Sequence, residues 1–136
     1  MPLCVLDASV TIAALIEEDR SDEARRILRD VVSDSATVPG IWLLEVGNVL
    51  LLAERRKSLS AAARRDHLAD LSRLPIVIDH ATASHAWHDT MALAERHGLT
   101  LYDAVYLELS LRQQLPIATF DAALRRAAEA ANVPLL

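Results

Sequence analysis

Cysteine is nearly missing from this sequence, and long apolar runs are missing altogether. The single cysteine, Cys4, cannot form an internal disulfide, and its place in an apolar run predicts a small buried side chain. The run Val49–Ala53 is far shorter than the roughly 18 to 20 apolar residues that a membrane-spanning helix needs. Residues Met1–Asp7 have neither the basic leader nor the apolar stretch of a secretory signal. We therefore expect a cytoplasmic protein.

An excess of basic residues is also missing. The chain has 14 Lys and Arg against 19 Asp and Glu, a net charge of −5, which is the wrong sign for holding nucleic acid by bulk electrostatics. Any contact with nucleic acid should therefore be local. Basic residues that could reach phosphates are clustered at Arg25–Arg26, Arg55–Lys57, Arg64–Arg65 and Arg125–Arg126. Solvated helix faces explain most of these clusters equally well.

Length and composition predict a single globular domain, residues 1–136. A chain of 136 residues can bury a substantial core. Its 52% hydrophobic and 24% charged residues are typical of a globular protein rather than a disordered one. No linker, repeat or low-complexity segment divides the chain.

Apolar runs and helical patterns alternate along the sequence. Strands are predicted at Leu3–Leu6, Thr37–Pro39 (a strand or a turn), Ile76–Ile78, Pro116–Thr119 and, as an edge strand, Val133–Leu136. Helices are predicted at Val10–Ile16, from Ser21 onward, at Ile41–Arg56, from Ser60 to about Leu71, at Thr82–His97, from Thr100 or Tyr102 to Gln113, and at Ala122–Ala131. This order predicts an α/β fold, a three-layer α/β/α sandwich with a mostly parallel central sheet of four to five strands. Sites in such folds lie beyond the carboxyl ends of the strands.

Four acidic residues occupy positions that could meet at that edge. Asp7 and Asp121 each follow an apolar strand, Asp103 lies near a helix start, and Glu45 interrupts an apolar stretch of a helix. Each has an ordinary explanation as well: a turn, a helix cap or a surface glutamate. Four carboxylates gathered at one place, however, would repel one another unless a cation compensated them.

The chemistry of these side chains indicates which cation. A set of oxygen ligands favours Mg²⁺ or Mn²⁺ over zinc. The sequence His85-x-x-His88 has a spacing that can ligate a transition metal on one helix face, but no third soft ligand accompanies it. We therefore expect a divalent hard cation at the acids.

The acids lie in four short motifs that resemble those of PIN-domain ribonucleases. The motifs are Val5–Ser9, Glu45–Asn48, Leu101–Ala104 and Ala118–Asp121. Their order and spacing match along nearly the whole chain, and together they look most like the VapC-like toxins, which consist of a bare PIN domain. The resemblance implies a PIN-like fold and a metal-dependent endoribonuclease.

The resemblance also implies roles for individual residues and partners. The catalytic acids would be Asp7, Glu45, Asp103 and Asp121. All of them except Glu45 would bind Mg²⁺ or Mn²⁺ directly, as one ion or two. Ser9 and Thr119 would place hydroxyls near the metal, and Asn48 would position Glu45. The partners implied are an RNA substrate, a small antitoxin protein and a second copy of the chain in a homodimer.

Two other functions compete with this interpretation. The first is a non-catalytic PIN-like module that binds RNA or protein. The second is a phosphatase of the haloacid dehalogenase type, suggested by a strand that ends in Asp7 with Thr11 following. Such phosphatases need a second aspartate two residues after the first, and Ser9 stands there.

Overall fold

The computed structural model describes residues 1–16 and 18–136, and its centre is a parallel sheet. Within those residues four strands form the sheet, in the order β3-β2-β1-β4. The strands are β1 (Val5–Leu6), β2 (Ala36–Pro39), β3 (Ile76–Asp79) and β4 (Ile117–Ala118). Val5 pairs with Thr37 on one side and with Ile117 on the other, and every neighbouring pair is parallel. All carboxyl ends of the strands therefore lie along one edge.

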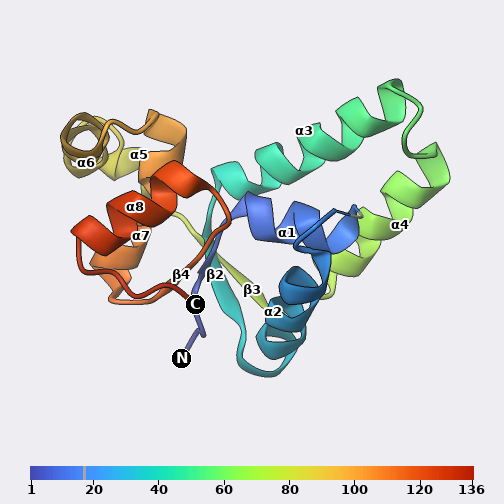
Figure 1. Ribbon diagram of the computed structural model, residues 1–136, viewed down its shortest axis with the longest axis horizontal. Helices are drawn as coiled ribbons and strands as arrows, with labels where there is room; N and C mark the ends of the chain where they lie inside the picture. The colour runs from blue at the N-terminus through green and yellow to red at the C-terminus, as the bar shows by residue number, and fades with distance from the viewer. Residues whose placement is uncertain (17) are drawn as a thin grey trace.

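Helices cover both faces of the sheet, as Figure 1 shows. On one side lie α1 (Ala8–Leu15), α2 (Ser21–Asp34), α3 (Ile41–Arg55) and α4 (Ala61–Ser72). On the other lie α5 (Thr82–His85), α6 (Asp89–His97), α7 (Leu101–Gln113) and α8 (Ala122–Ala130). This is the predicted three-layer α/β/α sandwich. None of the described helices is both long and apolar enough to cross a membrane.

The core lies where α7 crosses the central strands. Every residue from Ala104 to Ser110 is buried, because the sheet covers one side of the helix and α6 the other. Side chains with no exposed surface include Val5, Leu6, Tyr106, Leu107, Leu109 and Ile117. Burying an aliphatic or aromatic side chain contributes roughly 1.5 to 3 kcal/mol. Cys4 is buried as predicted, and burial raises the pKa of its thiol to about 12.

The helix predicted at Thr82–His97 is wrong in one respect. The structure has two helices there, α5 and α6, separated by a turn at residues 86–88. His88 has φ −117° and ψ −102°, which is not helical. The turn contains neither Gly nor Pro, so no breaker marked it. The end of α6 is as predicted, because Gly98 adopts a left-handed φ of 63° directly after His97.

Three other segments differ from their predictions. The β-branched run Ile76–Ile78 is typical of a buried strand, but β3 is at the edge of the sheet and Val77 is 52% exposed. The predicted strand Val133–Leu136 is reduced to one bridge between Leu135 and Ile117. Ser21 is the first residue of α2 rather than its cap, and its hydroxyl donates to the carbonyl of Ala13 at 2.6 Å.

Candidate active site

The parallel sheet brings the four predicted acids to one edge. Asp7 directly follows β1 and Asp121 comes three residues after β4. Glu45 lies in the second turn of α3, which begins just beyond the carboxyl end of β2. Since α7 leads back across the sheet to β4, its first turn, with Asp103, starts at the same edge. Topology therefore accounts for the convergence.

Asp7 is the most deeply buried of the four acids. Asp7 is 5% exposed. Its Oδ2 accepts hydrogen bonds from Ser9 Oγ at 2.5 Å and from Thr119 Oγ1 at 2.7 Å. Burial raises the pKa of this carboxyl, and the two hydroxyls partly oppose that rise. Asp7 precedes α1 but makes no side-chain capping bond to it. A capping role therefore does not explain the side chain.

The two hydroxyls join the ends of β1 and β4. Ser9 Oγ and Thr119 Oγ1 are 3.4 Å apart. The backbone N–H of Phe120 donates to Ser9 Oγ at 3.0 Å, and that of Asp121 donates to Thr119 Oγ1 at 3.1 Å. Ser9 lies in the first turn of α1 and is part of this junction. It fixes Asp7 relative to the segment that carries Asp121.

Glu45 and Asp103 approach from α3 and α7. Burial raises the pKa of Glu45, the hydrogen bond from Tyr106 opposes that rise, and the charges of Asp7 and Asp103 add to it. Burial also raises the pKa of Asp103, and the charges of Asp121 and Asp7 raise it further. The acids therefore repel one another across the site.

Glu45 is held by a residue that the sequence analysis missed. Tyr106 Oη donates to Glu45 Oε1 at 2.6 Å. Asn48, predicted to hold Glu45, is exposed, and within the described residues the structure records no hydrogen bond between the two. The signal that could have found Tyr106 is its spacing, because it lies three residues after Asp103 and hence on the same helix face.

Asp121 has two connections. Its Oδ2 accepts from the backbone N–H of Leu124 at 2.8 Å and caps α8, as the ordinary explanation expected. The charge of Asp121 nevertheless acts on Asp103. One carboxylate oxygen therefore serves the helix, while the group as a whole contributes to the negative field of the site.

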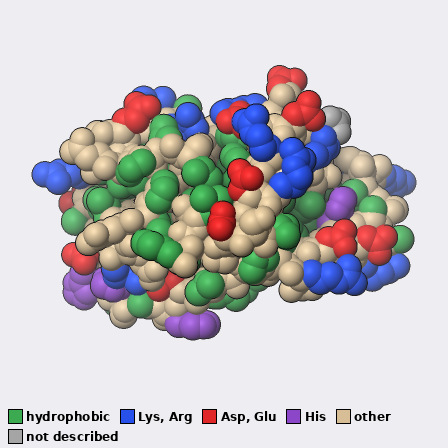
Figure 2. All heavy atoms as spheres, turned by 90° about the horizontal axis from the view of Figure 1, so that it is seen from below, with side chains coloured by type: hydrophobic (Ala, Val, Ile, Leu, Met, Phe, Trp, Pro, Cys, Tyr) green, Lys and Arg blue, Asp and Glu red, His purple; other side chains and the backbone are tan. Residues whose placement is uncertain are grey.

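Only some of the basic clusters are close to the acids. Arg125 Nη1 donates to the carbonyl of Thr119 at 2.8 Å, so this arginine lies beside the site. Arg20 places its guanidinium 3.9 Å from the ring centroid of Phe120, the residue before Asp121. Arg64 instead pairs with Glu54, away from the acids. On the face seen in Figure 2, Lys and Arg form separate groups among Asp and Glu rather than a continuous basic surface.

The side chains at this edge suit a hard cation. No three His, Cys, Asp or Glu side chains among residues 1–16 and 18–136 already stand close enough to hold an ion. The donors themselves are carboxylate and hydroxyl oxygens, which Mg²⁺ and Mn²⁺ prefer. In the same described part of the chain, no Lys or Arg forms an ion pair with any of the four acids. The site therefore carries uncompensated negative charge.

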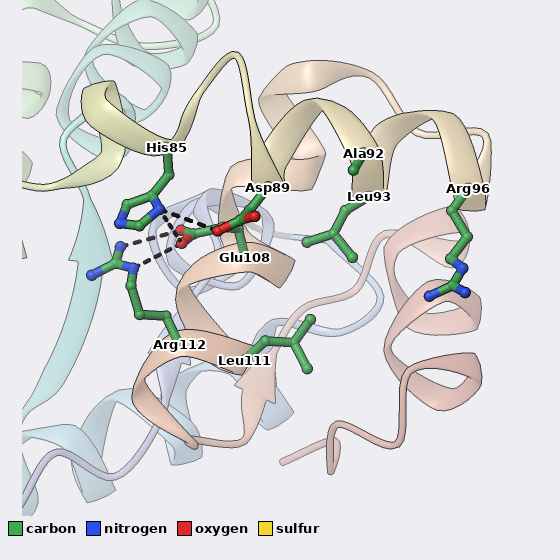
Figure 3. A pocket seen from close by; sticks show the side chains of 8 residues that line it. All are labelled: His85, Asp89, Ala92, Leu93, Arg96, Glu108, Leu111 and Arg112. Carbon is green, nitrogen blue, oxygen red and sulfur yellow. Dashed lines mark hydrogen bonds and ion pairs between the residues drawn. The ribbon is translucent and has the colours of Figure 1, made fainter.

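A second group of charged residues lies apart from the acids, beside a cavity of about 640 Å³ between α6 and α7. Arg112 donates to Asp79 at 2.8 and 3.0 Å and to the buried Glu108 at 2.7 Å. Figure 3 shows His85, Asp89, Glu108 and Arg112 pointing toward one another at one end of this cavity. Arg112 lowers the pKa of Asp79. Asp79 and Glu108 thus share one paired arginine within the chain.

The two histidines considered as a metal pair do not form one. His85 ends α5, and its Nδ1 lies 3.5 Å from Asp89 and 3.6 Å from Glu108. His88 lies in the turn before α6 and is exposed. The break between the helices removes the single face on which an i, i+3 pair would have met.

Comparison with known proteins identifies the family to which this fold and acid pattern belong. Residues 4–130 match the family model described as the PIN domain. The chain belongs to the PIN-domain family. This membership removes the phosphatase alternative that Asp7 and Thr11 had suggested. Thr11 Oγ1 accepts from Trp42 Nε1 at 3.1 Å inside the core, which is a structural contact.

Relatives and solved structures agree with membership in the PIN-domain family. Ribonuclease VapC1 of Mycobacterium tuberculosis is 30% identical over 93% of this chain and 92% of its own length. The crystal structure of VapBC2 from Rickettsia felis, bound to a DNA fragment from their promoter, has a TM-score of 0.67 at 18% identity and covers 97% of this chain and 96% of its own. A toxin-antitoxin complex from Klebsiella pneumoniae has a TM-score of 0.58 at 20% identity, covering 87% and 86%.

Proposed function

We propose that this protein is a Mg²⁺- or Mn²⁺-dependent endoribonuclease, the toxin of a type II toxin-antitoxin pair, built as one PIN-like domain over residues 1–136. One observation carries the proposal. Four carboxylates meet at the carboxyl edge of the sheet, three of them have raised pKa values, and no cationic side chain of the described residues pairs with them. The name of the relative, Ribonuclease VapC1, supports the nuclease activity.

In this proposal Asp7, Asp103 and Asp121 hold the divalent cation, and Glu45 completes the set of catalytic acids. Bound there, Mg²⁺ or Mn²⁺ supplies a Lewis acid that lowers the pKa of water and offsets charge on the scissile phosphodiester. The chain's own residues preorganise the site. Ser9 and Thr119 fix Oδ2 of Asp7, and neither of them donates to its Oδ1.

The RNA is held locally, since the chain as a whole is negatively charged. Arg125, beside Thr119, and Arg20, over Phe120, are the arginines that lie next to the acids. Each can contact a phosphate on the strand that enters the site. The phosphodiester chemistry is the same in transfer, ribosomal and messenger RNA, so the acids themselves do not select among these substrates.

The proposed partners are a small antitoxin protein and a second copy of the chain. The likeness to a toxin-antitoxin complex supports the antitoxin. Exposed large apolar side chains support association, because Leu44 and Leu43 on α3 are 74% and 51% exposed, and Trp87, in the turn before α6, is 82% exposed. A protein that meets RNA and a small antitoxin in this way works in the cytoplasm.

Cleavage of a mixed pool of structured RNA tests the proposal. Purified protein, freed of any partner, is incubated with Mg²⁺, Mn²⁺ or EDTA, and the fragments are mapped. We expect discrete cuts that require metal and disappear in Asp7→Asn and in Asp103→Asn. The matched control is Asp30→Asn, which changes an exposed aspartate on α2 and should cut as the wild type does. Metal binding by folded protein without any cleavage would instead favour the non-catalytic binding module.

Growth after expression tests the toxin assignment separately. Expression of the chain alone should arrest growth, and the Asp103→Asn variant should not. A chain that cleaves RNA in the tube but never arrests growth, and that purifies without a small partner, would contradict the toxin role while leaving the nuclease intact.

A further inference from the structure

The hydroxyl of Tyr106 joins two helices of the site. Tyr106 lies on α7 and has no exposed surface. Its hydroxyl donates to Glu45 Oε1 at 2.6 Å, on α3, a helix that lies on the opposite side of the sheet (Figure 1). A single phenol thus links α7 to α3 at the edge where the acids meet.

Glu45 has little else to hold it in place. Glu45 is half-buried: Leu43 and Leu44, which precede it on α3, are exposed, whereas Val46, which follows it, is buried. Among the residues described, Tyr106 is the one side chain that hydrogen-bonds to Glu45. A glutamate has several rotatable bonds, and ordering it costs conformational entropy. A short hydrogen bond from a buried phenol offsets that cost before any ligand arrives.

The spacing on α7 places Tyr106 on the face of the helix that points to the site. Asp103 and Tyr106 are three residues apart and lie on the same face of the helix. The helix therefore presents one acid of the site and, one turn later, the donor that holds another acid. The bond occupies Oε1 of Glu45 and leaves Oε2 without a donor in the described structure.

We propose that Tyr106 is a positioning residue, which fixes Glu45 so that its free oxygen faces the site of the divalent cation. The inference rests on the proposed metal-dependent function. The alternative is that Tyr106 is a core side chain whose hydroxyl uses the nearest acceptor, as buried tyrosines commonly do. The two differ in whether the hydroxyl matters when Glu45 is no longer a carboxylate.

A double-mutant cycle on Mn²⁺ affinity tests this, with free Mn²⁺ followed by electron paramagnetic resonance. The proteins are the wild type, Tyr106→Phe, Glu45→Gln and the double variant. We expect Tyr106→Phe to weaken Mn²⁺ binding about fivefold to tenfold in the wild-type background, the order expected for the loss of one ordinary hydrogen bond. In the Glu45→Gln background the same change should alter the affinity by less than about twofold.

Tyr102→Phe is the matched control, since Tyr102 lies on the same helix and is 64% exposed. It should leave Mn²⁺ affinity unchanged. If Tyr106→Phe does not fold, Glu45→Gln tests the same contact from the acceptor's side, because it removes the charge that the Tyr106 hydroxyl stabilises and should itself weaken Mn²⁺ binding. With RNA as substrate, Tyr106→Phe should lower kcat at saturating Mg²⁺ and leave KM for RNA unchanged.

Two results would overturn the inference. Equal Mn²⁺ affinity in the wild type and Tyr106→Phe would show that the hydroxyl holds nothing the cation needs. Equal losses in both backgrounds would show a general structural role. The proposed function is tested separately. If it is correct, the wild type binds Mn²⁺ and Asp103→Asn does not; a wild type that binds no Mn²⁺ would refute both the function and this inference.

Discussion

Acidic side chains gather in two regions of this molecule, and the regions differ in whether a basic side chain pairs with them. Near α6 and α7, Arg112 bonds to both Asp79 and the buried Glu108, and the pKa of Asp79 is lowered. At the carboxyl edge of the sheet, the described residues give the acids hydroxyl and phenol partners but no paired Lys or Arg, and the pKa values of Asp7, Glu45 and Asp103 are raised.

The difference separates acids whose charges are paired within the fold from acids whose charges repel one another. Removing the arginine from a buried ion pair strongly destabilises the folded state, whereas mutually repelling acids destabilise it until something positive binds. A protein retains such an arrangement where function requires it. The carboxyl edge of the sheet is therefore the functional region, and the group formed by Arg112, Asp79 and Glu108 is a structural one.

Removing the guanidinium of Arg112 should have the largest effect on the free energy of unfolding. Arg112→Met leaves Asp79 and Glu108 without their partner, with side chains only 7% and 4% exposed, and should lower the free energy of unfolding by about 3 kcal/mol. Arg96→Met, at the exposed end of the same cavity, should cost less than about 0.5 kcal/mol. Urea denaturation measures both. Similar costs for the two variants would show that pairing with Asp79 and Glu108 gives Arg112 no special structural role.

The same chemical change should have opposite signs in the two regions. Asp79→Asn removes the charge that Arg112 stabilises and should lower the free energy of unfolding by about 1 to 2 kcal/mol. Asp103→Asn removes a charge that Asp7 and Asp121 repel, and should raise the melting temperature of the metal-free protein by about 3 °C. Thermal melts in EDTA provide the comparison. A destabilised Asp103→Asn protein would contradict the repulsion.

The pH dependence sharpens the second comparison. The pKa of Asp103 is raised on folding, so its contribution to stability is fully present below its unfolded pKa and is lost as pH rises through the folded value. The advantage of Asp103→Asn over the wild type should therefore shrink as pH falls from 7 toward 4. For Asp79, whose folded pKa is lowered, the advantage of the wild type over Asp79→Asn should persist to lower pH and vanish below the folded pKa. Melts across this range, without metal, test both trends.

The smallest effect on stability concerns Asp121, which serves both as a cap and as an acid of the site. Asn caps a helix about as well as Asp, so Asp121→Asn should change the free energy of unfolding by less than about 0.5 kcal/mol while abolishing cleavage. Asp121→Ala should lose about 1 kcal/mol and the cleavage as well. Retained cleavage in Asp121→Asn would reduce Asp121 to a cap.

Much of the fold followed from patterns that are local in the chain. The apolar run before Asp7, the left-handed Gly98 after His97 and the helix formers from Ala122 onward all lie where they were predicted. Alternating strands and helices then required a parallel sheet. Because such a sheet gathers its carboxyl ends at one edge, the meeting of Asp7, Glu45, Asp103 and Asp121 could be expected from sequence alone.

The errors concern features that depend on tertiary contacts. The turn after α5 has no Gly or Pro, and the apolar residues of β3 do not show that the strand lies at the edge of the sheet. The resemblance assigned the positioning of Glu45 to Asn48, three residues along the chain, whereas the side chain that donates to Glu45 is Tyr106, 61 residues away. Arg112 joins Asp79 across 33 residues, and no short motif announces such a contact.

The melting temperature of the wild type with and without Mn²⁺, beside that of Asp103→Asn, tests the central claim most directly. If the acids bind a divalent cation, millimolar Mn²⁺ should raise the melting temperature of the wild type by several degrees and should stabilise Asp79→Asn as much. It should leave the melting temperature of Asp103→Asn unchanged. Equal stabilisation of the wild type and Asp103→Asn, or none in either, would contradict the account.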